Sequence, residues 1–291
     1  MGKRESYLVP VLCVLGAMIS LASGANLAKA LFSQAGPIGL TVVRTAIGAA
    51  ILCVFWRPWR FGITKAQVKA ILPYGICLGL MNLSFYLAIE RLPIGLAIAI
   101  EFLGPLAIAL LYSKKLFDLV WAGLAALGIF LILPVMQSSD PIDLVGVGYA
   151  MGAAFMWALY IVLGKKAGAS AHAGVVTSLG MLIAFISTVP FGIGNASNLF
   201  STTTGIALAV GVGLLSAAIP YSLEMFALKR LPEKYFGLLM SLEPAIGSVL
   251  SFIYLREVLS PLQIAAIFCV VVASVGSGYT HKTDPVDQYP A

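Results

Sequence analysis

Residues 121 to 133 read WAGLAALGIFLIL, an unbroken run of apolar and small residues from Trp121 to Leu133. A second run, IAAIFCVVVA, extends from Ile264 to Ala273. Neither run shows the alternation of polar and apolar residues that marks the strands of a membrane β-barrel. Long apolar runs are typical of helices that cross a bilayer, which takes roughly 20 residues for about 30 Å of hydrocarbon. The pattern therefore predicts an all-α membrane protein.

The composition supports the same fold class. Of the 291 residues, 60% are hydrophobic and 10% are charged, and the mean hydropathy is +0.99. A soluble domain carries about 25% charged residues, so a soluble globular protein, a disordered chain and a disulfide-rich secreted scaffold are excluded. We expect a polytopic protein with ten transmembrane helices, at residues 7–32, 37–56, 69–89, 94–112, 119–136, 144–163, 173–192, 204–227, 235–254 and 258–279.

The basic residues predict the orientation of these spans. Cytoplasmic loops carry an excess of lysine and arginine, and most of the 18 basic residues fall in alternate loops. Only Arg91 and Arg256 fall in the other set of loops. The same dispersal argues against a nucleic-acid partner, which would need the charge on one surface. With both termini cytoplasmic, the inner set is Lys3, Arg4, Arg57, Arg60, Lys65, Lys69, Lys114, Lys115, Lys165, Lys166, Lys229, Arg230, Lys234 and Lys282.

An internal repeat divides the chain into two halves. The segment AIERLP at 88–93 matches ALKRLP at 227–232, which begins 139 residues later, and LGP at 103–105 matches LEP at 242–244. We expect a first five-helix repeat at 1–140, a second at 141–280 and a cytoplasmic tail at 281–291. An odd number of spans per repeat inverts the second copy, and inverted repeats are a recurrent plan of secondary transporters. Their substrates bind near the midplane at the repeat interface.

Enzymatic and cofactor motifs are missing from the sequence. It contains no G-x-x-x-x-G-K-[ST] phosphate loop, so direct ATP coupling within the chain is not expected. The two histidines, His172 and His281, are far apart and loop-placed, which predicts no metal site and no nucleophile–base pair. We therefore expect no cofactor and no enzymatic activity.

Charged residues inside predicted spans are the first candidates for a transport site, because exposing them to lipid is costly. Arg44 and Glu101 lie roughly 9 and 10 Å from the outer boundary at 1.5 Å per residue, so they can pair; a purely structural salt bridge explains them equally well. Glu243 lies about 12 Å deep with no basic residue at its level. Glu224 and Lys29 are expected close to the membrane interfaces, where a role outside transport explains them as well.

Uncharged polar and aromatic residues complete the candidate site. Asn82 and Tyr86 belong to the third predicted span, Trp157 to the sixth and Tyr221 to the eighth. Prolines at 105, 220 and 244 predict helix breaks, because proline removes an i→i−4 hydrogen bond. The glycine pairs at 75/79 and 148/152 predict close helix contacts.

These residues resemble the EamA type of the drug/metabolite transporter superfamily, and more closely its inner-membrane threonine/homoserine exporter branch. The matching motifs are Met81-Asn82 with Phe85-Tyr86-Leu87, Glu101-Phe102 with Gly104-Pro105-Leu106, Pro220-Tyr221-Ser222-Leu223-Glu224-Met225, and Met240-Ser241 with Glu243-Pro244-Ala245. The resemblance implies a bacterial inner-membrane protein that exports small hydrophilic amino acids, coupled to protons. It also implies that a monomer can suffice.

Side-chain chemistry agrees with an amino-acid substrate. Arg44 can bind a carboxylate in a bidentate pair, and Glu101 or Glu243 can receive the ammonium group. The expected substrate site is Arg44, Asn82, Tyr86, Glu101, Trp157, Tyr221 and Glu243, with Glu243 and Glu101 as the proton-coupling residues. The open alternatives are another metabolite (a purine, an aromatic compound or a sugar derivative), uptake instead of export, and a membrane enzyme or scaffold.

Overall fold

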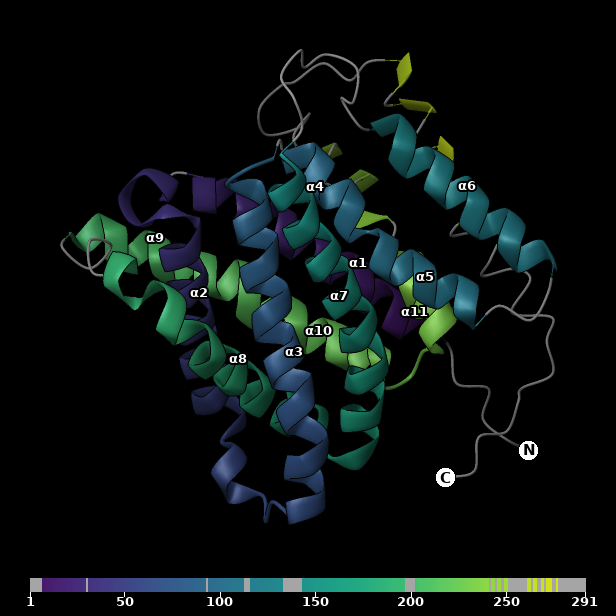
Figure 1. Ribbon diagram of the computed structural model, residues 1–291. Helices are drawn as coiled ribbons and strands as arrows, with labels where there is room; N and C mark the ends of the chain where they lie inside the picture. Colours follow the sequence, from purple (N-terminus) through teal and green to yellow (C-terminus); the bar gives the residue numbers. More distant parts are fainter. Residues whose placement is uncertain are drawn as a thin grey trace, which may run out of the picture.

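The described part of the protein is helical throughout and contains no strand, which confirms the all-α prediction (Figure 1). The computed structural model describes residues 7–29, 31–92, 94–112, 116–132, 143–196 and 202–240, and short pieces of 242–276. The elements are α1 (Leu8–Lys29), α2 (Phe32–Trp56), η1 (Pro58–Arg60), α3 (Lys65–Ile89), α4 (Ile94–Glu101), α5 (Leu103–Leu111), α6 (Leu116–Ile132), α7 (Leu144–Ser170), α8 (Ala173–Ala196), α9 (Thr203–Gly213), η3 (Leu214–Ala218), α10 (Ile219–Leu228) and α11 (Glu233–Met240).

Five of the described helical segments are long and apolar enough to cross a membrane, so the chain is a polytopic membrane protein. They are Gln34–Arg60, Lys65–Ile89, Leu144–Ser170, Ala173–Gly192 and Thr203–Leu228. The last two predicted spans, 235–254 and 258–279, fall partly outside the described residues. The count of ten spans therefore stays a prediction.

Two prolines coincide with departures from regular α-helix. The predicted span 94–112 is divided into α4 and α5, with the break at Phe102. Pro105 lies four residues after Glu101 and has no N–H to donate to the Glu101 carbonyl, which explains a break at this point. Ahead of Pro220, the five residues of η3 form a π-helical turn, in which the Ile219 N–H bonds to the Leu214 carbonyl. The third predicted break, at Pro244, lies outside the described residues.

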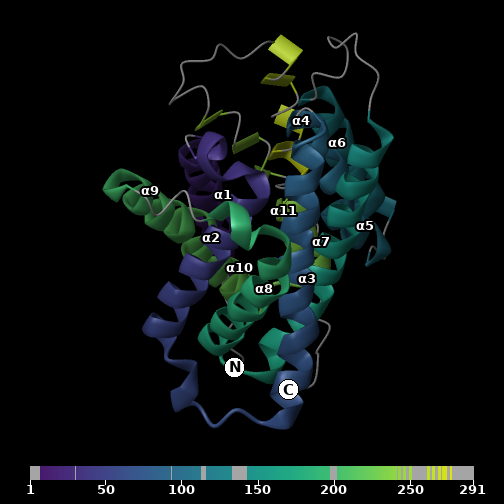
Figure 2. The same cartoon turned by 60° about the vertical axis from the view of Figure 1, so that its left-hand side comes forward.

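Helices from the two halves of the chain pack against each other in pairs. α3 lies along α7 and α8, α2 along α8, α1 along α10, and α5 against α11 (Figures 1 and 2). Small residues permit the α3–α8 contact, since a Cβ on Gly75 would lie 2.6 Å from the Ile183 Cβ and one on Gly79 would lie 2.8 Å from the Ala184 carbonyl oxygen. The packing prediction is wrong for Gly148, because no atom lies within 4 Å of a Cβ there.

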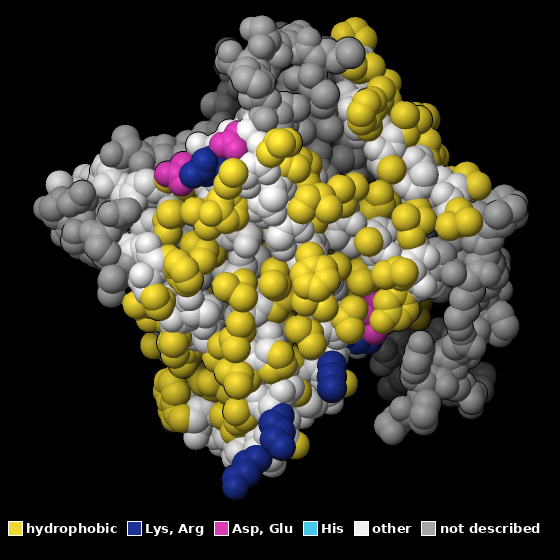
Figure 3. Space-filling view, in the orientation of Figure 1, with side chains coloured by type: hydrophobic (Ala, Val, Ile, Leu, Met, Phe, Trp, Pro, Cys, Tyr) yellow, Lys and Arg dark blue, Asp and Glu magenta, His cyan; other side chains and the backbone are white. Residues whose placement is uncertain are grey.

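The surface of the helices is divided into an apolar middle and charged ends. Figure 3 shows hydrophobic side chains over the centre of one face, lysines and arginines at its lower end, and a small group of acidic and basic side chains at its upper end. Asp143 caps the N-terminus of α7. It accepts a hydrogen bond from the Val145 N–H at 2.8 Å and forms a 3.1 Å ion pair with Arg91. These contacts hold the pKa of Asp143 below its usual value of 3.8. They also fix the start of the helix that carries Trp157.

Candidate functional site

A buried arginine lies at the centre of a cluster of polar side chains. Arg44 on α2 is 6% exposed. Its Nη1 donates to the Tyr86 hydroxyl at 3.3 Å, its Nη2 donates to Asn82 Oδ1, and its guanidinium carbon lies 5.2 Å from the centre of the Tyr86 ring. Its Nε is buried without a hydrogen-bond partner. The arginine is therefore held by neutral groups of α3 and keeps an unused donor.

Asn82 connects this arginine to the second half of the chain. Its Nδ2 donates to the Leu78 carbonyl at 2.8 Å and to the Tyr221 hydroxyl at 3.2 Å, and the same hydroxyl lies 3.3 Å from Asn82 Oδ1. Asn82 and Tyr221 are 139 residues apart, which is the spacing of the internal repeat. Four of the seven predicted site residues, Arg44, Asn82, Tyr86 and Tyr221, thus form one hydrogen-bonded group.

The predicted ion pair between Arg44 and Glu101 is wrong. No nitrogen of Arg44 lies within 4 Å of a Glu101 oxygen, although the two charges interact at longer range. Equal depth in the membrane does not determine the direction in which each side chain leaves its helix. Arg44 turns toward Asn82 and Tyr86 on α3 instead.

Glu101, Trp157 and Glu243 form the other side of the candidate site. Glu101 ends α4 and is 8% exposed. The next residue, Phe102, packs on Trp157 with ring centroids 4.8 Å apart. Glu243 is half-buried and interacts electrostatically with both Glu101 and Glu224.

Sequence reasoning missed three residues of this interior. Glu224 is only 4% exposed, and its Oε2 accepts a 2.9 Å hydrogen bond from the Tyr160 hydroxyl. Its predicted position near the cytoplasmic interface stays a prediction. Tyr160 stacks on Tyr74 at 5.4 Å and meets Tyr221 edge-on at 6.2 Å. One signal was available, since residues 221 and 224 share a helix face at i,i+3 spacing. The side chain of Lys29, the other residue expected at an interface, lies outside the described residues.

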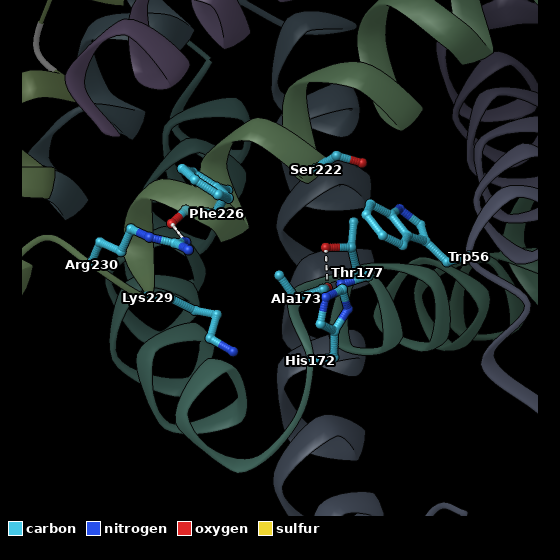
Figure 4. A pocket seen from close by; sticks show the side chains of 9 residues that line it. Trp56, His172, Ala173, Thr177, Ser222, Phe226, Lys229 and Arg230 are labelled. Atoms are coloured by element: carbon cyan, nitrogen blue, oxygen red, sulfur yellow. Dashed lines mark hydrogen bonds between the residues drawn. The ribbon is translucent and has the colours of Figure 1, made fainter. Parts of the chain in front are cut away.

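A cavity of about 220 Å³ opens beside this site, where α2 and α10 end and α8 begins (Figure 4). The Lys229 Nζ donates to the Ala171 carbonyl at 2.7 Å, and the Arg230 guanidinium lies 3.6 Å from the Phe226 ring centre. None of the predicted site residues lines the cavity, but Ser222 follows Tyr221 directly. The lining residues include no carboxylate; they are Trp56, His172, Ala173, Gly174, Thr177, Ser222, Phe226, Lys229 and Arg230.

Comparison with known proteins gives the family. Residues 144–279 match the EamA-like transporter family. The threonine/homoserine exporter RhtA of Salmonella typhimurium (strain LT2) is 44% identical over 277 residues, which cover 95% of this chain and 94% of the relative. The chain belongs to the EamA-like transporter family. The threonine/homoserine exporter RhtA of Escherichia coli (strain K12) is also 44% identical, over 276 residues that cover 95% of this chain and 93% of the relative.

A solved structure confirms the fold of this EamA-like transporter. A crystal structure that is 17% identical superimposes with a TM-score of 0.75, over 95% of this chain and 100% of the other. The family assignment confirms the resemblance seen in the sequence and the expectation of a transporter instead of an enzyme.

Proposed function

We propose that this EamA-like transporter exports threonine, homoserine and similar small amino acids across the bacterial inner membrane in exchange for protons. The observation that carries the proposal is the 44% identity to exporters of that name over 95% of the chain. The buried arginine cluster supports it, because an amino acid carries a carboxylate that a guanidinium binds in two parallel hydrogen bonds. The site comprises Arg44, Asn82, Tyr86, Glu101, Trp157, Tyr221 and Glu243.

Each charged end of the substrate has a partner in this site. The carboxylate binds Arg44, whose Nε is an unused donor. The ammonium group binds near Glu101, a buried carboxylate within electrostatic range of Arg44. Phe102 and Trp157 provide an apolar wall for the substrate side chain. Asn82 and Tyr221 offer an amide and a hydroxyl to the substrate's own hydroxyl group.

The transport cycle in this proposal is alternating access between two inverted repeats, 1–140 and 141–280, with ten spans and cytoplasmic termini. The pairing of α1 with α10 and of α3 with α7 supports it, because an inverted repeat relates these two contacts to each other. The Asn82–Tyr221 hydrogen bond supports it too, since a pseudo-twofold axis brings equivalent positions together. Lys65 and Lys69 lie in the first turns of α3, and the Arg91–Asp143 pair lies beyond its last turn. The lysines at the first end support a cytoplasmic position for that end.

The cavity at the ends of α2 and α10 is the cytoplasmic entrance in this proposal. Lys229 and Arg230 attract the substrate carboxylate there, and no lining carboxylate competes for it. Tyr221 lies one residue from the cavity and belongs to the arginine cluster. In this proposal the substrate enters at Ser222 and passes Tyr221 on its way to Arg44.

Counterflow in proteoliposomes tests the function directly. Vesicles loaded with unlabelled threonine or homoserine should accumulate labelled threonine, while vesicles loaded with purines, sugars or aromatic compounds should not. A pH gradient of either sign should drive net threonine movement from the alkaline compartment to the acid compartment, as expected for proton antiport. Counterflow with a purine and none with threonine would show that the substrate is a purine instead of an amino acid.

A further inference from the structure

α7 and α10 lie close together near their C-terminal ends, where two glycines of α7 face α10. A Cβ on Gly164 would lie 2.6 Å from the Cδ2 atom of Leu228. A Cβ on Gly168 would lie 2.7 Å from the Cγ atom of Lys229 and 3.2 Å from the sulfur of Met225. Leu228 and Met225 are both fully buried. Small residues at four-residue spacing let two helices approach closely, so α7 and α10 are closed against each other at this end.

Two lysines join these helix ends in a reciprocal way. The Lys229 Nζ, at the end of α10, donates to the carbonyl of Ala171, the residue that follows α7, at 2.7 Å. The Lys165 Nζ, on α7, donates to the carbonyl of Leu231, beyond the end of α10, at 2.6 Å. Carbonyls at a helix end lack intrahelical partners, and an ammonium group is a strong, charged donor to them. Each helix therefore contributes a lysine that binds just past the end of the other.

The contact between α7 and α10 has no comparable counterpart in the first half of the chain. α7 packs mainly on α3, α4 and α5, whereas α10 packs mainly on α1. In the proposed inverted repeat, the contact of α7 with α10 corresponds to a contact of α1 with α3 at the opposite side of the membrane. Within the described residues of those two helices, α1 and α3 do not pack on each other to a similar extent. Closure on one side only is what alternating access requires of a transporter that faces the other side.

We propose that Lys165 and Lys229 form a latch that holds α7 to α10 and closes the cytoplasmic side of the transporter. The inference rests on the alternating access proposed above and deepens it by naming residues of one gate. Lys229 also lines the cavity assigned to the cytoplasmic entrance (Figure 4). Both lysines are half-buried, so water can replace the two carbonyls when the helices part. The latch opens when the site faces the cytoplasm, and Met225 and Leu228 then become accessible from that side.

The test measures access to the buried side of the latch. Met225→Cys, in a chain whose four native cysteines are replaced by alanine, is labelled in inside-out vesicles with a membrane-impermeant maleimide. Adding Lys165→Met or Lys229→Met should speed labelling about tenfold, because loss of one charged hydrogen bond shifts the equilibrium toward the open form. Lys166→Met, which removes the neighbouring exposed lysine, should leave the rate unchanged. Unchanged labelling in all three lysine variants, even with a lower thermal unfolding midpoint, would show that the lysines only cap helix ends and would overturn the latch.

A reversible crosslink supplies the second readout and decides if the lysine variants do not fold. In Gly168→Cys combined with Lys229→Cys, the two Cβ atoms lie within about 4.2 Å, which suits a disulfide. Oxidation should stop threonine counterflow and reduction should restore it, while each single variant should ignore both treatments. Counterflow that continues in the oxidised double variant would overturn the latch. Absence of threonine counterflow in the wild type would instead overturn the proposed substrate, and the labelling experiment, which needs no substrate, still tests the latch.

Discussion

The Arg44 cluster differs from the carboxylates Glu101 and Glu224 in how its charge is compensated. Two hydrogen bonds from α3 side chains and a ring face hold the Arg44 guanidinium. Glu224 has one hydroxyl donor, and Glu101 has a distant cation. A well-held charge suits binding, because it is already oriented for a ligand. An under-compensated carboxylate suits a change of protonation, because both of its states are within reach.

Removing the well-held charge should have the largest effect. Arg44→Gln takes away the guanidinium and leaves the substrate carboxylate unpaired in a buried site. The loss of one partner of a buried charged pair costs at least about 2 kcal/mol, which weakens threonine binding about 30-fold or more. Binding to purified protein measures the effect, and Arg60→Gln, at an exposed arginine, is the matched control. Binding unchanged in Arg44→Gln would place the substrate elsewhere.

Glu243→Gln should separate substrate exchange from proton coupling. The substitution keeps the shape of the side chain but fixes it in a neutral form. Net threonine flux driven by a pH gradient should be abolished, while exchange of labelled for unlabelled threonine continues. Both are measured in the same proteoliposome preparation. Gradient-driven flux equal to the wild type would contradict proton coupling through this residue.

A smaller effect is expected at the hydrogen bond that joins the two halves of the chain. Tyr221→Phe removes the hydroxyl that meets Asn82, and a typical hydrogen bond contributes about 1 kcal/mol. Threonine affinity should fall about fivefold. Tyr112→Phe, on an exposed tyrosine at the end of α5, should have no effect. An equal loss of threonine affinity in both variants would show that the Tyr221 hydroxyl contributes to folding instead of to substrate binding.

The last predicted effect is on stability and concerns the position of Glu101 relative to α7. A Cβ on Gly104 would overlap the Ala154 carbonyl oxygen, so Gly104→Ala should push α5 away and lower the thermal unfolding midpoint by the equivalent of about 1–3 kcal/mol. Gly148→Ala adds the same atom where no neighbour lies within 4 Å. It should be neutral or slightly stabilising, because alanine is the better helix former. Equal midpoints would show that α5 is free to shift.

The helical fold and the burial of Arg44 and Glu101 could be predicted from the sequence because each depends on a local pattern. Apolar run length predicts spans, and burial cost singles out Arg44, Glu101 and Glu243 among the charged residues. The absence of an Arg44–Glu101 ion pair and the burial of Glu224 could not be predicted in the same way. Both depend on the direction in which a side chain leaves its helix, and a one-dimensional depth estimate leaves that direction out.

The π-helical turn at Leu214–Ala218 also changes the direction in which side chains leave the helix that follows it. An i→i+5 bond places one more residue in a turn than the α-helix has, and one residue corresponds to about 100° of rotation. Everything after Ala218 is therefore turned relative to α9, including Tyr221 and Glu224. Deleting one residue from this turn would restore an unbroken α-helix and rotate Tyr221 away from Asn82. The extra residue therefore sets the direction in which this helix presents Tyr221 and Glu224 to the interior.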